Sequence, residues 1–223
     1  MKRAICILSG GMDSATASYI AKRDGYDIVA LHFCYSQRTQ QRELKAFNDI
    51  ADTLGAKKYV IDLGFFENIG ASALVDKDIE VPTGGIAPGV PVTYVPFRNG
   101  IFLSVAAAIA EKEGAEAIFI GVVEEDSSGY PDCRKSFIES MERSINLGTR
   151  DETNIEIKTP LIDLKKEDIV TLASKMGVPL ELTWSCYKES ETACGVCDSC
   201  RLRLKGFKKA KLKDPIPYMI KVE

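Results

Sequence analysis

An apolar run at residues 4–8 leads directly into a glycine-rich turn at residues 9–14, which read Ser-Gly-Gly-Met-Asp-Ser, and then into helix-forming sequence. Glycines let the backbone approach an anion closely, and the unpaired amides at a helix start attract phosphate. The turn has no lysine, so it is not a Walker A loop, which ends in Gly-Lys-Ser/Thr. The pattern predicts a strand followed by a phosphate-binding turn; the alternative is a strand–helix turn that binds nothing.

Strand-like and helix-like segments alternate along the rest of the chain. Alternation of this kind predicts βαβ units and a parallel sheet covered on both faces, here a Rossmann-like, doubly wound α/β fold. Ligands of such sheets bind at the carboxyl ends of strands, where the glycine-rich turn falls. The expected strands are residues 4–8, 28–33, 58–63, 117–123 and 155–157, and the expected helices are residues 13–23, 40–54, 98–112, 134–146 and 165–176.

Composition narrows the class of protein. The chain has 223 residues, 45% of them hydrophobic and 27% charged, which fits one large globular domain or one domain with an appendage. The formal net charge of −3 argues against a protein whose main task is to bind nucleic acid through its phosphates. No apolar stretch reaches membrane-spanning length, and the first one is too short for a signal peptide. We therefore expect a cytoplasmic protein with reduced cysteines and no membrane partner.

Four of the seven cysteines lie close together near the C-terminus, at Cys186, Cys194, Cys197 and Cys200. Four thiolates with Cys-x₂-Cys spacing indicate tetrahedral zinc, although an iron–sulfur cluster uses similar runs. Free thiols or a redox pair are a third interpretation. We expect one structural Zn²⁺ per subunit, because a closed four-cysteine site leaves no position for a substrate. The zinc would tie a small C-terminal helical region, residues 184–223, to a main domain of residues 1–183.

The other metal-binding residue types are expected to be structural. Cys6 and Cys34 fall in or beside apolar strands and should be packed thiols, whereas Cys133 falls in a polar loop that could expose it. The single histidine, His32, ends an expected strand beside a phenylalanine. We expect it to be a buried, hydrogen-bonded histidine rather than a ligand of a nucleotide.

A polar segment at residues 128–134, Ser-Gly-Tyr-Pro-Asp-Cys-Arg, follows the expected strand at residues 117–123. Its place at the carboxyl end of a strand makes it a candidate substrate loop. Tyr130 could stack on a planar ring, Asp132 could accept ring N–H groups, and Arg134 could pair with a carboxylate. The alternative is a turn that only begins the next helix.

The turn at residues 9–14 resembles the PP-loop of the N-type ATP pyrophosphatases. The resemblance implies that the loop holds the β,γ-pyrophosphate of ATP, and that ATP is cleaved between its α- and β-phosphates to adenylate a substrate oxygen. Asp13 would then lie near the Mg²⁺ that neutralises the phosphates. The residues that the resemblance assigns to ATP are Leu8, Ser9, Gly10, Gly11, Met12, Asp13, Ser14 and Ala15.

With Val-Pro-Phe-Arg-Asn at residues 95–99, the segment at residues 128–134 and the four cysteines, the chain resembles the 7-cyano-7-deazaguanine synthases of queuosine biosynthesis, a tRNA modification. The resemblance runs over residues 5–207. It implies an ATP-dependent ligase that turns the carboxylate of 7-carboxy-7-deazaguanine into a nitrile with ammonia, by adenylating first the carboxylate and then the amide. The candidate catalytic residues are Asp13, Ser14, Arg98 and Lys165, and the candidate substrate residues are Tyr130, Asp132 and Arg134.

Two other functions stay open. A PP-loop tRNA thiolase would adenylate a tRNA base, but it would need a basic surface. A zinc-knuckle module that binds nucleic acid would use the basic segment at residues 201–213, which fits a solvated helix face better. We expect a small-molecule substrate, free ammonia and no stable nucleic-acid partner; the oligomeric state is open, with a homodimer among the options.

Overall fold

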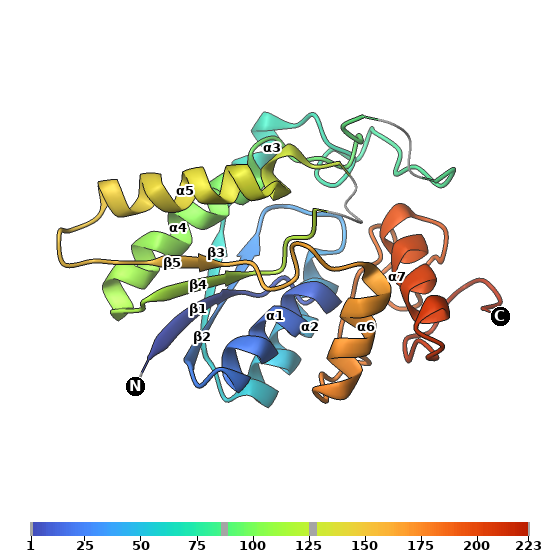
Figure 1. The fold of residues 1–223 in the computed structure, drawn as a ribbon. Helices are drawn as coiled ribbons and strands as arrows, with labels where there is room; N and C mark the ends of the chain where they lie inside the picture. Colours follow the sequence, from blue (N-terminus) through green and yellow to red (C-terminus); the bar gives the residue numbers. More distant parts are fainter. Residues whose placement is uncertain (1, 86–88, 125–128, 223) are drawn as a thin grey trace.

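The protein, represented by a computed structural model that describes residues 2–85, 89–124 and 129–222, is built on one parallel sheet (Figure 1). The sheet has the strand order β3-β2-β1-β4-β5, and all four neighbouring pairs run parallel. Its strands are β1 (Arg3–Ile7), β2 (Asp27–Cys34), β3 (Lys57–Asp62), β4 (Ala117–Ile120) and β5 (Glu156–Lys158). The chain moves outward from β1 to β3, then crosses back to β4. The expected doubly wound α/β fold is thereby confirmed, and the sheet has its switch point between β1 and β4.

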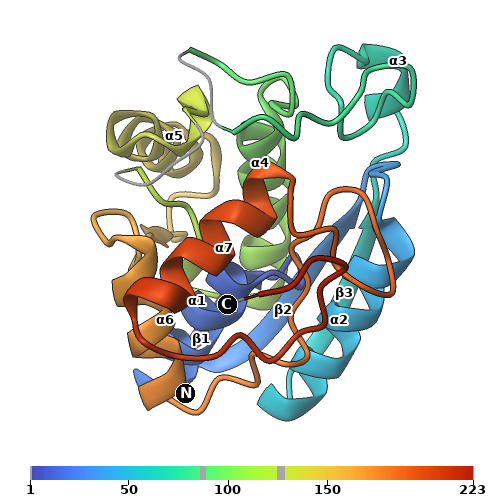
Figure 2. The same cartoon turned by 90° about the vertical axis from the view of Figure 1, so that its right-hand side faces the viewer.

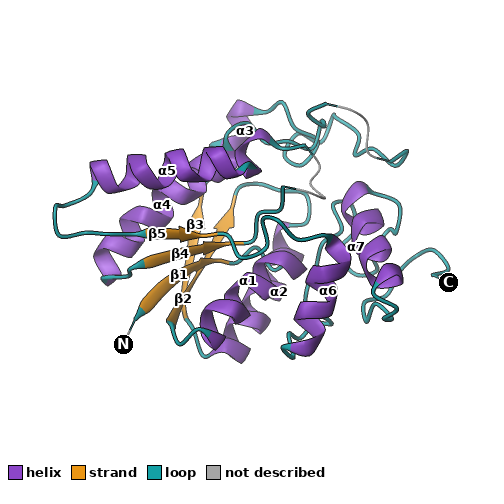
Figure 3. Ribbon diagram, in the orientation of Figure 1, coloured by secondary structure: helices purple, strands orange, loops and turns teal. Residues whose placement is uncertain are grey.

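Helices cover both faces of this sheet, as Figures 1 and 3 show. One face carries α4 (Arg98–Glu113) and α5 (Lys135–Gly148). The other carries α1 (Met12–Arg23), α2 (Gln40–Leu54) and α6 (Lys166–Lys175). The shorter elements are α3 (Phe66–Ile69) and the 3₁₀ turn η1 (Pro131–Cys133), and α7 (Asp198–Lys209) follows the cysteine-rich segment.

The central strand, β1, shows why a continuous apolar run in the sequence predicts a strand of a buried parallel sheet. Successive side chains of a strand point to opposite faces, so Ile5 and Ile7 pack under α4 and α5, whereas Ala4 and Cys6 pack against α1 and α2. All four are buried, because helices cover both faces. Each helix therefore needs an apolar stripe on its inner side, and Phe47, Ile50, Ala51 and Leu54 supply it in α2.

All ten expected helices and strands are present, and their ends differ from the expected ones by at most three residues. The expected strand at residues 117–123 stops at Ile120, because the chain leaves the sheet at Gly121 to pass beside the glycine-rich turn. Cys133 is buried, with 8% of its surface exposed, and its sulfur accepts a hydrogen bond from Asn99. The expectation that the polar loop could expose it is therefore wrong. Cys6, Cys34 and His32 are buried, as expected.

The C-terminal region packs closely on the sheet and its helices. α7 lies beside α6 in both views (Figures 1 and 2), and Trp184 and the four clustered cysteines join an apolar cluster that includes Ala46 of α2. Arg203 of α7 is only 2% exposed and forms an ion pair of 2.8 Å with Asp214. The basic segment at residues 201–213 is therefore not a uniformly solvated face. None of the helices in the described residues is long and apolar enough to cross a membrane.

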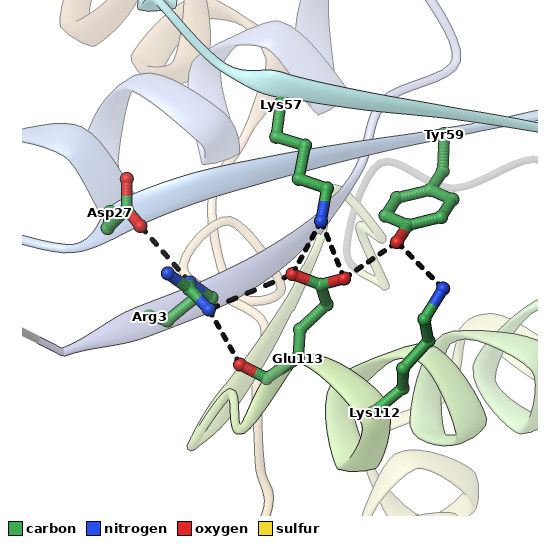
Figure 4. Close-up of polar contacts among 6 residues, drawn as sticks. All are labelled: Arg3, Asp27, Lys57, Tyr59, Lys112 and Glu113. Carbon is green, nitrogen blue, oxygen red and sulfur yellow. Dashed lines mark hydrogen bonds and ion pairs between the residues drawn. The ribbon is translucent and has the colours of Figure 1, made fainter.

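A network of polar side chains closes the amino-terminal edge of the sheet, opposite the glycine-rich turn (Figure 4). The carboxylate of Glu113, at the end of α4, accepts bonds from Lys57 Nζ at 2.8 and 2.9 Å and from Tyr59 Oη at 2.6 Å. Arg3 donates to the Glu113 backbone carbonyl at 2.8 Å and to Asp27 at 3.1 Å. Glu113 therefore ties α4 to the start of β1 and of β3, and Arg3 extends the network to Asp27, the first residue of β2.

This network predicts a stability change in acid. The hydrogen bond from Lys57, followed by the one from Tyr59, lowers the pKa of Glu113. A lowered folded-state pKa adds stability above the ordinary glutamate pKa of about 4.3, and that stability is lost as the pH falls through the lowered value. We expect Glu113→Gln to melt below the wild-type protein at pH 7 and the difference in melting temperature to be smaller at about pH 3. An equal difference at both pH values would contradict this account.

Candidate active site

A cavity of about 280 Å³ opens at the carboxyl ends of β1, β2 and β4. Residues of the glycine-rich turn form one wall, and the residues that follow β2 form another. Polar and charged groups face aromatic ones across it. The lining includes Asp13, Glu43, Arg98, Tyr130, Lys166 and Tyr187.

The glycine-rich turn needs glycine at its second position for two reasons. Gly10 has φ of +89°, a conformation that favours glycine. A Cβ there would lie 2.7 Å from the Glu43 carbonyl oxygen and 2.9 Å from the Cβ of Ala46. The first turns of α2 can therefore pack directly on the glycine-rich turn, which brings residues after β2 to the same cavity.

Two serines hold the turn in shape. Ser9 Oγ and Ser14 Oγ lie 3.0 Å apart, and the Ser9 amide donates to Ser14 Oγ at 3.1 Å. Ser14 Oγ also lies 3.0 Å from the Gly11 carbonyl, to which it donates. α1 begins at Met12, so the unpaired amides of its first turn belong to residues that line the cavity. The loop is therefore organised before a ligand binds.

A second glycine that shapes the site, Gly121, stands where the chain leaves β4 and was not among the sequence candidates. A Cβ at this position would lie 2.7 Å from both the Asp13 carbonyl carbon and the Ser14 amide nitrogen. The backbone at Gly121 thus packs against the backbone of the PP-loop, and only the absence of a side chain allows this approach. A lone glycine after an apolar strand gave no signal of such a contact in the sequence.

The cavity has cations near the PP-loop, but not all of those that the sequence suggested. Lys166 Nζ lies 2.7 Å from Asp13 Oδ2 and lines the cavity. Lys165, the sequence candidate, is exposed at the N-cap of α6 and does not line it. Arg98, at the start of α4, does line the cavity and donates to Tyr35 Oη at 2.9 Å. The geometry shifts the lysine candidate by one position.

This shift can be tested with a matched pair of variants. We expect Lys166→Ala to lower kcat/KM for ATP by about 100-fold, because it leaves Asp13 without its partner and removes a charge beside the loop. We expect Lys165→Ala to stay within about threefold of the wild type, because its side chain points to solvent. Steady-state kinetics with varied ATP would measure both, and a larger loss in Lys165→Ala would contradict the assignment.

The three candidate substrate residues lie in different settings. Tyr130 lines the cavity, and its hydroxyl lies 2.9 Å from Thr93 Oγ1. Asp132 is buried just outside the lining and accepts the Asn99 amide at 2.9 Å, and burial raises its pKa. Arg134 is exposed at the N-cap of α5 and away from the cavity wall. Asp132 therefore holds the start of α4, whereas Tyr130 is placed to touch a ligand.

The residues that the sequence predicted to bind ATP do not all line the cavity. The cavity is lined by Leu8, Ser9, Gly11, Met12, Asp13 and Ser14, whereas Gly10 and Ala15 lie behind the wall. Residues after β2 were missed, although they include Tyr35 and Glu43 in the lining. Their signal in the sequence is a polar segment at the carboxyl end of a strand, the same signal that selected residues 128–134.

The four clustered cysteines meet the geometry of a site for a single metal ion. Their sulfurs all lie within 4.8 Å of one another, and all four residues are buried. A tetrahedral Zn²⁺ with Zn–S bonds of about 2.3 Å would hold its sulfurs about 3.8 Å apart, close to the 4.0 Å between Cys194 Sγ and Cys200 Sγ. A four-iron cluster places an iron behind each thiolate and would spread the sulfurs farther.

Backbone amides also point at these sulfurs, as thiolate ligands require. Cys186 Sγ accepts the amides of Lys188, Glu189 and Cys194 at 3.3 to 3.4 Å, and Cys194 Sγ accepts the amide of Cys197 at 3.4 Å. Hydrogen bonds from the Cys197 and Cys200 thiols, together with the amides of Cys194 and Glu189, lower the pKa of Cys186 well below its usual range, and the same bonds raise the pKa of the two donor thiols. The amide donors therefore suit thiolate ligands at Cys186 and Cys194.

The cysteine-rich segment reaches the PP-loop through its neighbours. The Trp184 amide donates to the Gly10 carbonyl at 2.8 Å, and the Arg42 guanidinium lies 4.4 Å from the centre of the Trp184 ring. Ser185, Tyr187 and Leu202 line the cavity. A metal bound by the cysteines would thus brace one wall of the cavity.

Comparison with known families decides the classification. The family model described as "Queuosine biosynthesis protein QueC" matches residues 3–211, nearly the whole chain. The chain belongs to the QueC family. A QueC relative from Nautilia profundicola, named 7-cyano-7-deazaguanine synthase, is 69% identical over 98% of this chain and 99% of its own length. A relative of the same name from Campylobacter fetus is 64% identical over 98% of both chains.

Solved structures of other proteins share the fold of this QueC family member. A 4-thiouridine synthetase, solved as an RNA complex with bound ATP, matches with a TM-score of 0.54 at 19% identity, covering 94% of this chain and 50% of that one. A predicted subunit of a tRNA methyltransferase from Methanocaldococcus jannaschii matches with a TM-score of 0.52 at 20% identity, covering 78% and 76%. At these identities the likeness concerns architecture alone.

Proposed function

We propose that the protein is an ATP-dependent ligase that converts 7-carboxy-7-deazaguanine and ammonia into 7-cyano-7-deazaguanine for queuosine biosynthesis. The observation that carries the proposal is a single cavity in which a PP-loop faces Arg98 and a set of aromatic rings, in a chain 69% identical to a relative named for this activity. ATP and a flat, anionic substrate are the two ligands that such a cavity would bring together.

ATP supplies the activation that this reaction needs. A carboxylate is a poor electrophile, and its oxygen is a poor leaving group until it is adenylated. The PP-loop amides and Ser9 and Ser14 would hold the β,γ-pyrophosphate, and Lys166 would add a positive charge beside Asp13. The second carboxylate oxygen, Asp13 Oδ1, is buried with no hydrogen-bond partner in the described part of the chain. It suits a Mg²⁺ ion, which would neutralise charge on the phosphates.

The opposite wall would hold the substrate. Arg98 can pair with the substrate carboxylate and with negative charge on the adenylate. Tyr130 and Tyr187 line the same cavity and offer faces for a planar ring. Catalysis would then consist of positioning and charge neutralisation, without a covalent enzyme intermediate. Substrate contacts by Asp132 and Arg134 would require rearrangement of this wall.

The four cysteines would hold one structural Zn²⁺. The donor set is complete with four thiolates, so no position stays open for substrate chemistry. The ion would join α7 to the segment that starts at Trp184, and so keep residues 184–222 on the main domain. We assign it no part in the reaction.

A tRNA thiolase is not favoured by these observations, because the relatives are named for a small-molecule synthase and the net charge is −3. Nor do they favour a module that binds nucleic acid. Arg203 of the basic segment is buried in an ion pair with Asp214 and is not available to contact phosphate. We propose the cytoplasm as its compartment, where the thiolates stay reduced, and free ammonium as the nitrogen source.

Product analysis tests the proposal. The pure protein, supplied with 7-carboxy-7-deazaguanine, ammonium, Mg²⁺ and ATP, should give the nitrile together with AMP and pyrophosphate, as read by mass spectrometry. AMP formation without nitrile would move the substrate toward a tRNA base. Absence of ATP turnover in protein that retains its metal would refute the ligase.

A further inference from the structure

The reaction proposed above must remove protons from nitrogen, and the PP-loop offers no group for this. In its second half the amide oxygen attacks the α-phosphate, pyrophosphate leaves, and the cationic nitrogen loses one acidic proton to water. The product is a neutral imidate adenylate that still carries one N–H. That proton is weakly acidic and must leave as the nitrile forms, so a base beside the reacting carbon would accelerate this step.

Most candidates in the cavity lining are unsuited to that task. Asp13 is held by Lys166 at 2.7 Å. His32 Nδ1 lies 3.0 Å from the Leu8 carbonyl and must donate to it, which leaves Nε2 as the acceptor, but Nε2 is enclosed and burial lowers the pKa of the ring. Burial raises the pKa of Tyr35 and of Cys133 to about 12, so both keep their protons at neutral pH.

Glu43 differs from all of these. Its side chain is half-buried and lines the cavity, and its own backbone oxygen is the atom that packs against Gly10 of the PP-loop. Among the described residues no lysine or arginine nitrogen lies within ion-pair distance of its carboxylate. Of the two carboxylates in the cavity lining, Asp13 forms an ion pair and Glu43 forms none with the described residues.

Neutral groups fix the Glu43 carboxylate in place. Thr39 Oγ1 donates to Oε1 at 2.7 Å, and Gln37 Nε2 donates to Oε2 at 3.1 Å. Thr39 and Gln37 are themselves buried. Each carboxylate oxygen can accept more than one hydrogen bond, so both retain capacity toward the cavity. Burial raises the pKa of Glu43 by more than the hydrogen bonds from Thr39 and Gln37 and the positive charge of Arg98 lower it, which makes Glu43 a stronger base than an exposed carboxylate.

We propose that Glu43 is the general base of the nitrile-forming step and contacts the nitrogen of the imidate adenylate. The N–H bond breaks and its proton passes to a Glu43 carboxylate oxygen. The electron pair of that bond becomes the third bond between carbon and nitrogen. The bond between carbon and the AMP oxygen breaks, and AMP leaves with its electron pair. No oxidant or reductant takes part.

The test separates the two halves of the reaction in the full-length protein. We expect Glu43→Gln to convert the carboxylate to the amide at a rate within about threefold of the wild type, and to accumulate that amide. With the 7-carboxamide supplied directly, kcat for nitrile formation should fall by about 100-fold or more, whereas KM changes little. The matched control is Asp49→Asn, which neutralises a carboxylate on the outer part of the same helix and should leave both halves unchanged.

Three results would overturn the inference. Nitrile formation at the wild-type rate in Glu43→Gln would exclude a base role. Equal loss in both halves, or a raised KM with unchanged kcat, would make Glu43 a binding residue. If Glu43→Gln does not fold, Glu43→Asp decides, because a shortened carboxylate should slow nitrile formation alone. Failure of the proposed function would look different, since the wild-type protein itself would then make no nitrile.

Discussion

We expect the Gly121→Ala variant to lose at least about 100-fold in turnover while it stays folded. The added Cβ would lie 2.7 Å from the Asp13 carbonyl carbon and the Ser14 amide nitrogen, a distance that real Cβ atoms do not tolerate. One of the two backbones must move, and the PP-loop is the one that has to meet ATP. Displacement of a reacting group by about 1 Å costs on the order of 100-fold in rate, and overpacking costs about 1–3 kcal/mol in stability.

The control for this variant is Gly148→Ala. Gly148 ends α5, and a Cβ there would meet no atom within 4 Å, so we expect activity and stability close to wild type. Calorimetric ATP titration would show whether Gly121→Ala acts through the loop, because binding should weaken along with turnover. Normal ATP binding and turnover in Gly121→Ala would show that β4 can retreat without disturbing the PP-loop.

The second large effect is expected from loss of the metal. Replacing Cys197 with serine removes one of four ligands in a cluster whose sulfurs lie within 4.8 Å of one another. Binding of a structural metal contributes directly to the free energy of folding. A loss of roughly 4 kcal/mol would lower the melting temperature of a chain this long by about 10 °C. We also expect weaker ATP binding. Trp184 packs with the cysteines and lines the cavity, and its amide donates to the Gly10 carbonyl of the PP-loop at 2.8 Å, so loss of the metal should disturb the loop.

Cys34→Ala is the control for loss of a buried thiol. Cys34 ends β2, outside the cluster and outside the cavity lining, so its loss should cost far less than loss of Cys197. Metal analysis would accompany both variants, with one zinc per chain expected in Cys34→Ala and less in Cys197→Ser. Full stability and ATP affinity in a metal-free Cys197→Ser protein would contradict the structural role.

The sequence was sufficient for the sheet because its signals are local. A buried parallel strand such as β1 is a continuous apolar run, and α2 repeats its apolar residues at helical spacing. The tight cysteine spacing was also local, and the structure brings those four sulfurs together. Features of this kind need no knowledge of where distant segments meet.

The site was harder to predict, because its walls come from segments far apart in the chain. Glu43 reaches the cavity only because α2 packs on Gly10, and Gly121 matters only because β4 lies beside β1. The sequence does not reveal which of two adjacent lysines at the start of α6 faces the cavity. The structure places Lys166 in the lining, with Gly206 of α7 packed against its side chain, and leaves Lys165 exposed. Asp132 and Arg134 stay predictions as substrate residues; the structure places both outside the cavity lining, where the polar turn begins α5 and Asp132 accepts the Asn99 amide.

Isotope tracing of the carboxylate oxygens tests the central claim, which is adenylation of the substrate twice at one PP-loop. The wild-type protein would receive 7-carboxy-7-deazaguanine labelled with ¹⁸O in both carboxylate oxygens, with ATP and ammonium. The account predicts two AMP molecules for each nitrile and one ¹⁸O atom in each AMP, with unlabelled pyrophosphate. Label in inorganic phosphate or in water, with ADP as the nucleotide product, would contradict it.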